Sequence, residues 1–396
     1  KEQLDGILKD LADAEYKISD IKVGERIRKQ PLPFTTSTLQ QEASKVLNYS
    51  TQKTMRLAQQ LYEGVEIKGQ GTVGLISYLR TDSTRISDEA AKAAADFIKE
   101  SYGEEYLATA SAKKENKGKI QDAHEAIRPT DINRLPSSIK DSMAKDLFRL
   151  YQLIWKRFAA SQMAPAVYET TSVKIDAADY RFSVAASKVK FDGFMSVYTE
   201  ADSEKAEPNK LLNSLSMDTK LSFSEFHYDQ HFTQPPAHYT EASLVHTMEE
   251  LGIGRPSTYA PTITTILARR YVGKEGKNLF MTEIGDVVNN MMKEAFPSIV
   301  DVNFTVNMES LLDGIEEDSA NWKVILKNFY PDLEAAVEAA EKNLEHVKIA
   351  DEETDVKCDL CGRNMVIKYG PHGKFLGCPG FPECRNTKPY LEKIGV

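Results

Sequence analysis

Apolar residues change their spacing several times along the chain, and each spacing predicts a different kind of element. Leu4, Leu8 and Leu11 recur every three or four residues, which predicts a helix at the amino end. Residues 16–32 alternate apolar and polar, as strands do, and the same alternation returns over residues 167–234. We expect four to six strands in the second of these stretches.

Helical spacing dominates the sequence between the two alternating stretches. Ser37 and Thr38 are residue types that cap helices, and Gln40 and Gln41 follow three residues later, which is the spacing of a capping box. We therefore expect a helix to begin here. Further helices are expected at residues 50–64, from Ser87 onward and at residues 139–162.

The order of these patterns predicts an α+β protein of several domains. Because alternating stretches flank a helical one, a single β-rich domain would be built from two chain segments, with the helical part inserted between them. Pro235-Pro236 marks the next boundary, and the acidic residues 351–355 would form a linker. The expected domains are 1–34 with 165–234, which are β-rich; 35–164, the insertion; 235–350, which is mainly helical; and 356–396, a small metal module.

Composition narrows the class of protein. The chain has 396 residues, of which 41% are hydrophobic and 28% charged, as in ordinary globular proteins. No apolar run approaches the ~20 residues of a membrane span, and no signal peptide is visible, so we expect a cytoplasmic protein. The first residue is Lys1 rather than Met, so we expect a fragment or a processed chain. The net charge of −9 argues mildly against a nucleic-acid binder, so local basic clusters decide that question.

The cysteines form a C-x2-C pair followed by a C-x5-C pair. They are Cys358, Cys361, Cys378 and Cys384. Two short turns that each supply two thiolates are the pattern of a tetrahedral zinc site, and we favour Zn²⁺ over an iron–sulfur cluster. Phe375, Phe381 and Tyr390 are interleaved with lysine and arginine, which suits single-stranded nucleic acid. The alternative is a purely structural ribbon that docks another protein.

The stretch LISYLRTDSTR carries a candidate nucleophile. Most tyrosines are packing residues, but Tyr78 has Arg80 two residues on, and both would share a face if residues 75–76 form a short strand. A guanidinium could bind an oxygen of a phosphodiester while the phenolate attacks phosphorus. Asp82 and Ser83 offer further hydrogen bonds in the turn. The alternative for Arg80 is an ordinary salt bridge.

The stretch AHEAIRPT adds His124, Glu125 and Arg128. An imidazole near a phosphate can bind it or relay a proton, and Arg128 would lie on the same side of a helical turn as His124. Glu125 is better suited to hold an arginine than to contact DNA. A lone histidine is more often structural, and only its neighbours favour a functional role here.

A third cluster lies in the stretch LGIGRPSTYA. Ser257 and Thr258 stand at the amino end of an expected helix, where free amides and hydroxyls suit a phosphate, and Arg255 adds charge. Arg269 follows about three turns later. Ordinary helix capping explains Ser257 and Thr258 equally well.

Together these motifs closely resemble the bacterial type IA DNA topoisomerases. The matching stretches are PFTTSTLQQEAS, SYLRTDSTRIS, AHEAIRPT, PPAHYTEASLVHTMEELGIGRPSTYA and the four-cysteine ribbon, in the family's order over nearly the whole chain. The resemblance implies transient cleavage of one DNA strand through a 5′-phosphotyrosine, strand passage and religation, which relaxes negative supercoils without ATP. It assigns the nucleophile to Tyr78 and stabilisation of the scissile phosphate to Arg80 and His124. It places on the DNA path Asp82, Ser83, Arg128, Arg255, Ser257, Thr258 and Arg269.

The resemblance also implies an architecture. The β-rich domain would be an arch that lifts, the inserted domain would be winged-helix-like and carry Tyr78, and the helical domain would form part of the base. Enzymes of the family begin with a TOPRIM domain that binds Mg²⁺, and no such pattern precedes Tyr78. We therefore expect the central and C-terminal part of the enzyme, with Zn²⁺ in the ribbon, the Mg²⁺ ligands in the missing domain, and no relaxation by this chain alone.

The same resemblance predicts the partners. DNA is the expected substrate, RNA polymerase is a candidate partner of the C-terminal region, and no membrane is involved. We expect a monomer associated with the nucleoid. Two alternatives stay open: a topoisomerase III-like decatenase, and a noncatalytic zinc-ribbon protein that binds single-stranded DNA and for which Tyr78 would be dispensable.

Overall fold

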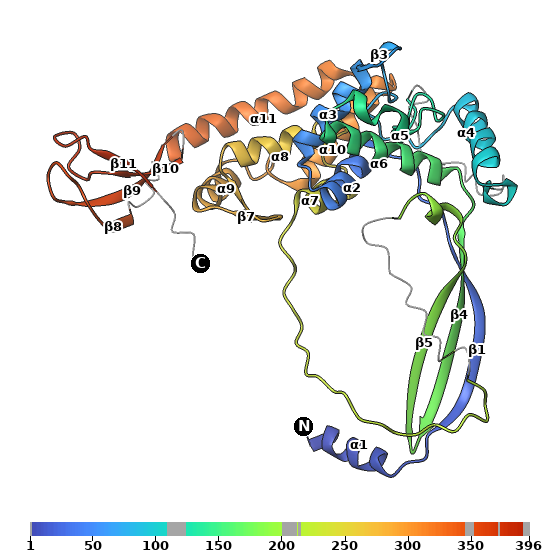
Figure 1. Ribbon diagram of the computed structural model, residues 1–396. Coiled ribbons are helices and arrows are strands. Elements are labelled where there is room, and N and C mark those ends of the chain that lie inside the picture. Colours follow the sequence, from blue (N-terminus) through green and yellow to red (C-terminus); the bar gives the residue numbers. More distant parts are fainter. Residues whose placement is uncertain are drawn as a thin grey trace. The chain divides into compact units, whose positions relative to one another are not determined.

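The computed structural model of the chain is drawn in Figure 1. It describes residues 2–108, 124–199, 212, 215–344, 352–370 and 373–390. The chain divides into two compact units, Lys1–Thr282 with Ser298–Trp322, and Glu283–Pro297 with Lys323–Val396. In the described residues, no helix is both long enough and apolar enough to cross a bilayer.

Three long antiparallel strands form the main sheet of the first unit. They are β1 (Lys17–Arg28), β4 (Ala166–Ala177) and β5 (Tyr180–Phe191), in the order β1-β4-β5, and α1 (Glu2–Ala12) precedes them. Ile18 faces Ile175 at one end of the β1–β4 pair, and Arg28 faces Ala166 at the other. The sheet therefore joins two parts of the chain that are far apart in sequence (Figure 1).

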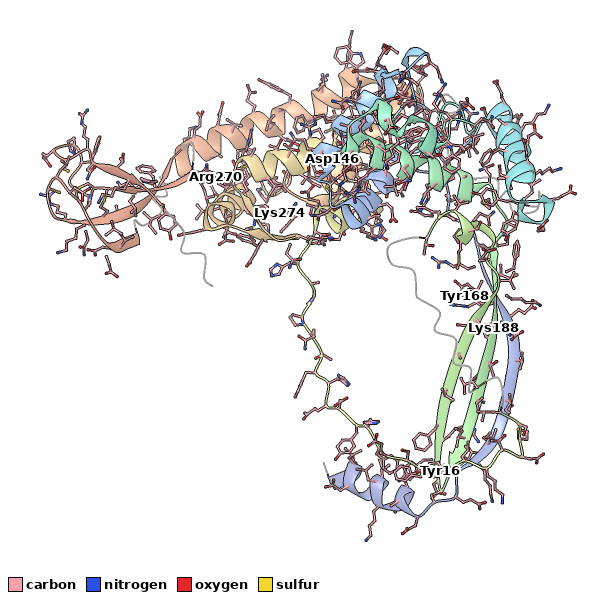
Figure 2. All side chains as sticks on the ribbon, viewed as in Figure 1. Tyr16, Asp146, Tyr168, Lys188, Arg270 and Lys274 are labelled. Atoms are coloured by element: carbon pink, nitrogen blue, oxygen red, sulfur yellow. The ribbon has the colours of Figure 1, made fainter. Side chains whose placement is uncertain are left out.

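Pairs of side chains along this sheet supplement a small apolar core. The Arg26 guanidinium lies 5.0 Å from the ring centre of Tyr168, and the Lys188 Nζ lies 2.9 Å from a carboxylate oxygen of Glu169. Figure 2 labels Tyr168 and Lys188 on neighbouring strands. Most side chains of β5 are exposed, so cross-strand pairs of this kind add to the backbone pairing that joins β5 to β4.

The prediction of four to six strands in residues 167–234 is wrong. Two strands, β4 and β5, are present there, and residues 215–239 contain no strand in the part of the chain that the structure describes. Leu215 and Leu221 pack on the sheet beside Ile18 and Val173. Alternation predicts which side chains share a face, but a strand also needs a neighbouring backbone to bond with, and the sequence does not reveal that.

The helical block packs around a large apolar core. Its helices are α2 (Thr36–Glu42), a π-helical turn η1 (Ala43–Leu47), α3 (Thr51–Glu63), α4 (Asp88–Ser101), α5 (Pro136–Ile139) and α6 (Lys145–Ser161). Its short elements are β2 (Val65–Ile67), β3 (Gly71–Val73), η2 (Glu104–Tyr106), η4 (Lys140–Ser142) and η5 (Gly193–Ser196). Phe34, Leu61, Tyr151 and Phe158 are almost completely buried in this core.

The predicted helix starts in this block are partly correct. Ser50 and Ser87 cap α3 and α4, as predicted. The cap of α2 is Thr35 rather than Ser37, and Thr38 completes the capping box instead of a glutamine. The predicted helix at 139–162 is also shorter, because α6 begins at Lys145 after the short turns α5 and η4.

A second helical part of this unit follows Pro235-Pro236. It contains α7 (Glu241–Leu251), α8 (Tyr259–Ala268), the hairpin β6 (Val272–Glu275) and β7 (Asn278–Met281), and α10 (Val302–Glu316). Val245, Met248, Tyr259 and Ile263 form its own buried cluster. The hairpin interrupts a region that the sequence predicts to be mainly helical.

The second unit contains two helices and a small sheet. They are α9 (Glu283–Ala295), α11 (Trp322–Asn343), and β8 (Glu352–Lys357), β9 (Asn364–Gly370), β10 (Gly373–Gly377) and β11 (Thr387–Pro389), in the sheet order β11-β10-β9-β8. The predicted acidic linker at 351–355 is wrong from residue 352 onward, because β8 pairs there with β9. Residue 351 lies outside the described residues. The four-domain division stays a prediction.

Candidate active site

Tyr78 lies in a loop whose backbone is fixed by hydrogen bonds on both sides. The amide of Leu75 donates to the carbonyl of Leu61, 2.7 Å away, at the end of α3. The amide of Ser77 donates to the carbonyl of Arg128 at 2.9 Å. The loop is therefore held between α3 and the AHEAIRPT segment.

The predicted strand at 75–76 is wrong, and burial rather than a strand turns Tyr78 outward. Ile76 makes one isolated bridge, with Pro129. Leu75, Ile76 and Leu79 are almost completely buried, whereas Tyr78 keeps 41% of its surface exposed. The apolar neighbours anchor the loop in the core, and the phenol is left accessible.

The structure brings Tyr78 and His124 together. Their ring centres are 5.6 Å apart with an interplanar angle of 27°, which is a stacked arrangement. On another side, the Tyr62 ring from α3 meets Tyr78 edge-on, also at 5.6 Å. Tyr62 was missed in the sequence, because nothing in its helical neighbourhood distinguishes it from a surface tyrosine. The phenol is thus positioned by two rings from separate segments.

Ser77 is a second residue that the motifs did not single out. Its hydroxyl donates to the carbonyl of Ala126 at 2.7 Å and accepts from the amide of Arg128 at 2.9 Å. This one side chain joins the tyrosine loop to the histidine segment. Its position next to Tyr78 is the feature of the sequence that could have identified it.

Arg80 is exposed and lines a cleft of about 370 Å³. Gln52 and Met55 of α3 form one wall, and Ser257 and Thr264, before and within α8, form another. Two separately predicted motifs, YLRTDS and GRPSTYA, therefore meet at one cleft. Arg80 contributes a guanidinium to it, and Ser257 and Thr264 contribute hydroxyls.

Arg128 is paired with Glu125, as the sequence suggested for the glutamate. The Arg128 Nε donates to a carboxylate oxygen of Glu125 at 2.7 Å. Burial alone would raise the pKa of Glu125, but the hydrogen bond and charge of Arg128 outweigh it, so the pKa lies below its ordinary value. The predicted helical turn is wrong, since residues 124–129 are not helical. Arg128 stabilises this segment in the structure, and its contact with DNA stays a prediction.

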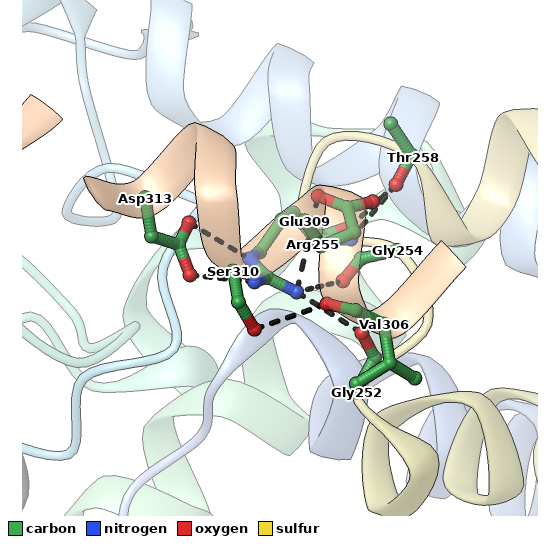
Figure 3. Close-up of polar contacts among 8 residues, drawn as sticks. All are labelled: Gly252, Gly254, Arg255, Thr258, Val306, Glu309, Ser310 and Asp313. Atoms are coloured by element: carbon green, nitrogen blue, oxygen red, sulfur yellow. Dashed lines mark hydrogen bonds and ion pairs between the residues drawn. The ribbon is translucent and has the colours of Figure 1, made fainter. Parts of the chain in front are cut away.

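Arg255 is the centre of a network of polar contacts with its own chain (Figure 3). Its guanidinium bonds to both carboxylate oxygens of Asp313 on α10, at 2.6 and 3.3 Å, and lies 3.9 Å from Glu309. It also donates to the carbonyls of Gly252 and Gly254. These contacts fix the turn before α8 against α10. To bind DNA as predicted, the Arg255 guanidinium would have to exchange some of these contacts for a phosphate.

The residues after Arg255 stay more open. The Thr258 hydroxyl accepts from the Arg255 amide at 2.8 Å and makes no side-chain cap of α8, so the helix-capping alternative does not explain it. Ser257 and Arg269, on either side of α8, are exposed. Ser257 therefore remains available to a ligand in the cleft.

The two remaining predicted contacts of the tyrosine loop differ in exposure. Ser83 is buried, and its hydroxyl accepts from the amide of Arg85 at 3.1 Å. Asp82 next to it is exposed. Ser83 therefore shapes the turn in this state, and Asp82 faces solvent.

The four cysteines form a compact sulfur cluster in the second unit. Their Sγ atoms all lie within 4.8 Å of one another, with Cys358 3.6 Å from Cys384 and Cys361 3.3 Å from Cys378. Four thiolates at about 2.3 Å from a tetrahedral Zn²⁺ would stand about 3.8 Å apart, so the donor set fits zinc. The Asn386 amide also donates to the Cys358 sulfur at 3.3 Å, which orients that ligand.

Comparison with known proteins identifies the family. The family described as DNA topoisomerase matches residues 1–327, and the one described as topoisomerase DNA binding C4 zinc finger matches residues 355–393. Full-length topoisomerase I from Thermotoga maritima is similar in structure, with a TM-score of 0.71 and 36% identity over 98% of this chain. The chain therefore belongs to the DNA topoisomerase family, in its bacterial type IA topoisomerase I group. It spans 62% of the length of the Thermotoga protein.

Proposed function

We propose that this chain supplies the nucleophile of a type IA DNA topoisomerase, which cuts one DNA strand, lets another pass and reseals the cut, relaxing negative supercoils without ATP. The observation that carries this proposal is Tyr78. It is accessible, stacked on His124 and anchored by buried neighbours, in a chain that matches the topoisomerase family over most of its length. A solvent-facing phenol held this firmly is better suited to chemistry than to packing.

In the proposed cleavage step, the phenol oxygen of Tyr78 loses its proton and forms a bond to phosphorus. The bond between phosphorus and the 3′ oxygen breaks, and that oxygen takes up a proton, leaving a 5′-phosphotyrosine. Religation is the reverse reaction. Since one phosphoester is exchanged for another, the energy of the cut bond is retained and no nucleotide triphosphate is needed.

The neighbouring residues have distinct roles in this proposal. His124, beside the Tyr78 ring, donates a hydrogen bond to a nonbridging phosphate oxygen, and Arg80 stabilises the charge that develops there. The cleft between Arg80 and Ser257 accepts the adjacent stretch of single strand. Mg²⁺ and the general acid for the 3′ oxygen are assigned to a TOPRIM domain outside this chain, as the family resemblance implies.

The zinc ribbon is proposed as a further contact with single-stranded DNA. Phe381 is 66% exposed, and the guanidinium of Arg385 lies 5.8 Å from its ring centre. An open aromatic face next to a cation suits base stacking with phosphate attraction. Zn²⁺ held by the four thiolates would stabilise the ribbon and would supply no chemistry of its own. Binding of RNA polymerase stays a prediction.

A trapping experiment tests the proposal. Labelled single-stranded DNA is incubated with this chain and a separately supplied amino-terminal domain, and covalent adducts are resolved under denaturing conditions. We expect an adduct that disappears in Tyr78→Phe and persists in Tyr62→Phe, a matched change in a neighbouring exposed tyrosine. An adduct that survives Tyr78→Phe would refute the assignment, and no adduct at all would favour the noncatalytic alternative. The chain by itself is expected not to relax supercoiled DNA.

A further inference from the structure

The arginines predicted to contact DNA differ in what holds them in the free chain. Arg80 is exposed, and its side chain has no hydrogen bond or ion pair among the described residues. Arg255 is held by two carboxylates of α10, those of Asp313 and Glu309. Arg80 can therefore accept a phosphate directly, whereas Arg255 has to give up a partner first.

The contacts of Arg255 divide between two parts of its guanidinium (Figure 3). Its Nη1 donates to the carbonyls of Gly252 and Gly254 at 3.3 and 2.7 Å. Its Nε and Nη2 donate to the two carboxylate oxygens of Asp313, at 3.3 and 2.6 Å. A phosphate offers the same pair of oxygens to this edge of a guanidinium as a carboxylate does. A phosphate could therefore replace Asp313 while the two backbone carbonyls keep Arg255 in place.

Asp313 can leave Arg255 at little cost to the fold. The Asp313 side chain is 53% exposed, and within the described part of the chain Arg255 is the one partner of its carboxylate. A carboxylate that is already half in water regains its hydration when an ion pair breaks. A buried structural ion pair would behave differently, because a charge left alone inside the protein is strongly unfavourable.

Glu309 adds a second negative charge at the same place. It lies one helical turn before Asp313 on α10, so the two side chains share a face of the helix. A carboxylate oxygen of Glu309 lies 3.9 Å from the Nη1 of Arg255, which is too far for a hydrogen bond. Two carboxylates thus surround one guanidinium, and their combined charge opposes the approach of a phosphate.

This network lies at the wall of the cleft that contains Arg80. Pro256 and Ser257, the two residues after Arg255, line that cleft. A single strand bound there would pass the turn that carries Arg255. Its phosphates could then compete with Asp313 for the guanidinium.

We propose that Asp313 is an internal competitor for DNA phosphate. In the free protein it occupies the phosphate-binding edge of Arg255, and a single strand has to displace it, while Glu309 adds to the opposing charge. The chain then binds a strand less tightly than its arginines alone would allow, which suits an enzyme that must release DNA after resealing. This inference rests on the proposed function, since single-stranded DNA is the ligand.

Binding of a labelled single-stranded oligonucleotide, followed by fluorescence anisotropy at one fixed salt concentration, tests the proposal. Asp313→Asn removes the competing charge. Glu316→Gln is the matched control, because it removes the same charge from an exposed residue of α10 that has no ion pair among the described residues. We expect Asp313→Asn to lower the Kd about two- to fivefold, the range of an exposed ion pair, and Glu316→Gln to lower it clearly less. A Kd that is unchanged or higher in Asp313→Asn, or equal gains in both variants, would overturn the proposal.

A double-mutant cycle with Arg255→Gln shows whether the gain passes through this arginine. In the Arg255→Gln background, Asp313→Asn should tighten binding no more than Glu316→Gln does, because no guanidinium is left to be freed. A purely structural role of Asp313 predicts weaker binding when its bonds are lost. A full gain that persists without Arg255 would reveal a general charge effect and refute the competitor.

Glu309→Gln keeps the test decisive if circular dichroism shows that Asp313→Asn is misfolded. This variant removes a charge but no hydrogen bond to Arg255, so we expect a smaller gain in affinity that also disappears in the Arg255→Gln background. With Asp313→Asn misfolded, no gain from Glu309→Gln would overturn the proposal.

The trapping experiment separates this inference from the proposed function. It uses the same variants with the amino-terminal domain supplied. Tighter binding by Asp313→Asn without any Tyr78 adduct would support the internal competitor and refute the topoisomerase assignment. A normal adduct with unchanged affinity in Asp313→Asn and Glu309→Gln would do the opposite.

Discussion

The tyrosine loop and the zinc ribbon reach a fixed geometry by opposite routes. Around Tyr78, a large apolar core holds the backbone, with Leu75 and Leu79 buried on either side of the exposed ring. The buried cluster of the ribbon has five members, two of which are themselves ligands, Cys358 and Cys378. In the helical block, the apolar core positions the Tyr78 side chain. In the ribbon, the metal-binding thiolates themselves stabilise the fold.

Removal of the metal should produce the largest difference in stability between the two regions. Chelation of zinc is expected to unfold β8 to β11, because apparent binding energies of such sites are on the order of 10 kcal/mol and the module has little other core. Limited proteolysis with mass spectrometry should show new cuts in residues 352–390. The helical block should stay protected. A ribbon that remains resistant after zinc has been shown to leave would mean that the metal does not stabilise its fold.

Removing one core side chain should damage the tyrosine loop. Leu75 is 0% exposed, so Leu75→Ala is expected to lower the free energy of unfolding of the helical block by about 2–5 kcal/mol through loss of burial and a new cavity. Urea denaturation measures the change. Leu32→Ala, at a residue that is 63% exposed, is the control and should change the value by less than about 0.5 kcal/mol. Equal effects of the two variants would mean that the core does not hold the loop.

Protonation of Glu125 should have the smallest effect on the free energy of unfolding. Its pKa is lowered in the folded chain, so its contribution to stability is present above its ordinary pKa of about 4.5 and is lost as the pH falls through the lowered value. Glu125→Gln should cost about 1 kcal/mol at neutral pH, and the difference from the unaltered chain should shrink below about pH 4.5. Denaturant melts over a pH series measure it. A difference that is independent of pH would show that the ion pair with Arg128 contributes nothing.

The sequence predicted features that depend on local chemistry. Ser50 and Ser87 begin helices because a hydroxyl satisfies the free amides of the first turn, and each short turn between two cysteines supplies a pair of thiolates. The approach of Tyr78 to His124 was predicted from the family resemblance and from the suitability of the two groups for one reaction. The helix starts and the cysteine turns needed no knowledge of distant packing, whereas the approach of Tyr78 to His124 came from the resemblance.

Features that depend on distant partners were wrong or missed. Residues 220–233 alternate like a strand but form none in the described structure, and residues 75–76 are fixed by burial instead of a sheet. The contact of Tyr62 with Tyr78 and the network of Arg255 with α10 follow from tertiary packing alone. Arg255 shows that an arginine in a functional motif can also be a structural residue of its own chain.

The pairing of Arg28 with Ala166 has a further consequence. The chain leaves the sheet at one of these residues and returns at the other, and neighbouring strands are only about 5 Å apart. Residues 29–165 are thus joined covalently to the sheet at two adjacent strand ends. A short turn could therefore connect Arg28 directly to Ala166. A comparably short turn could join the two ends of residues 29–165 to each other.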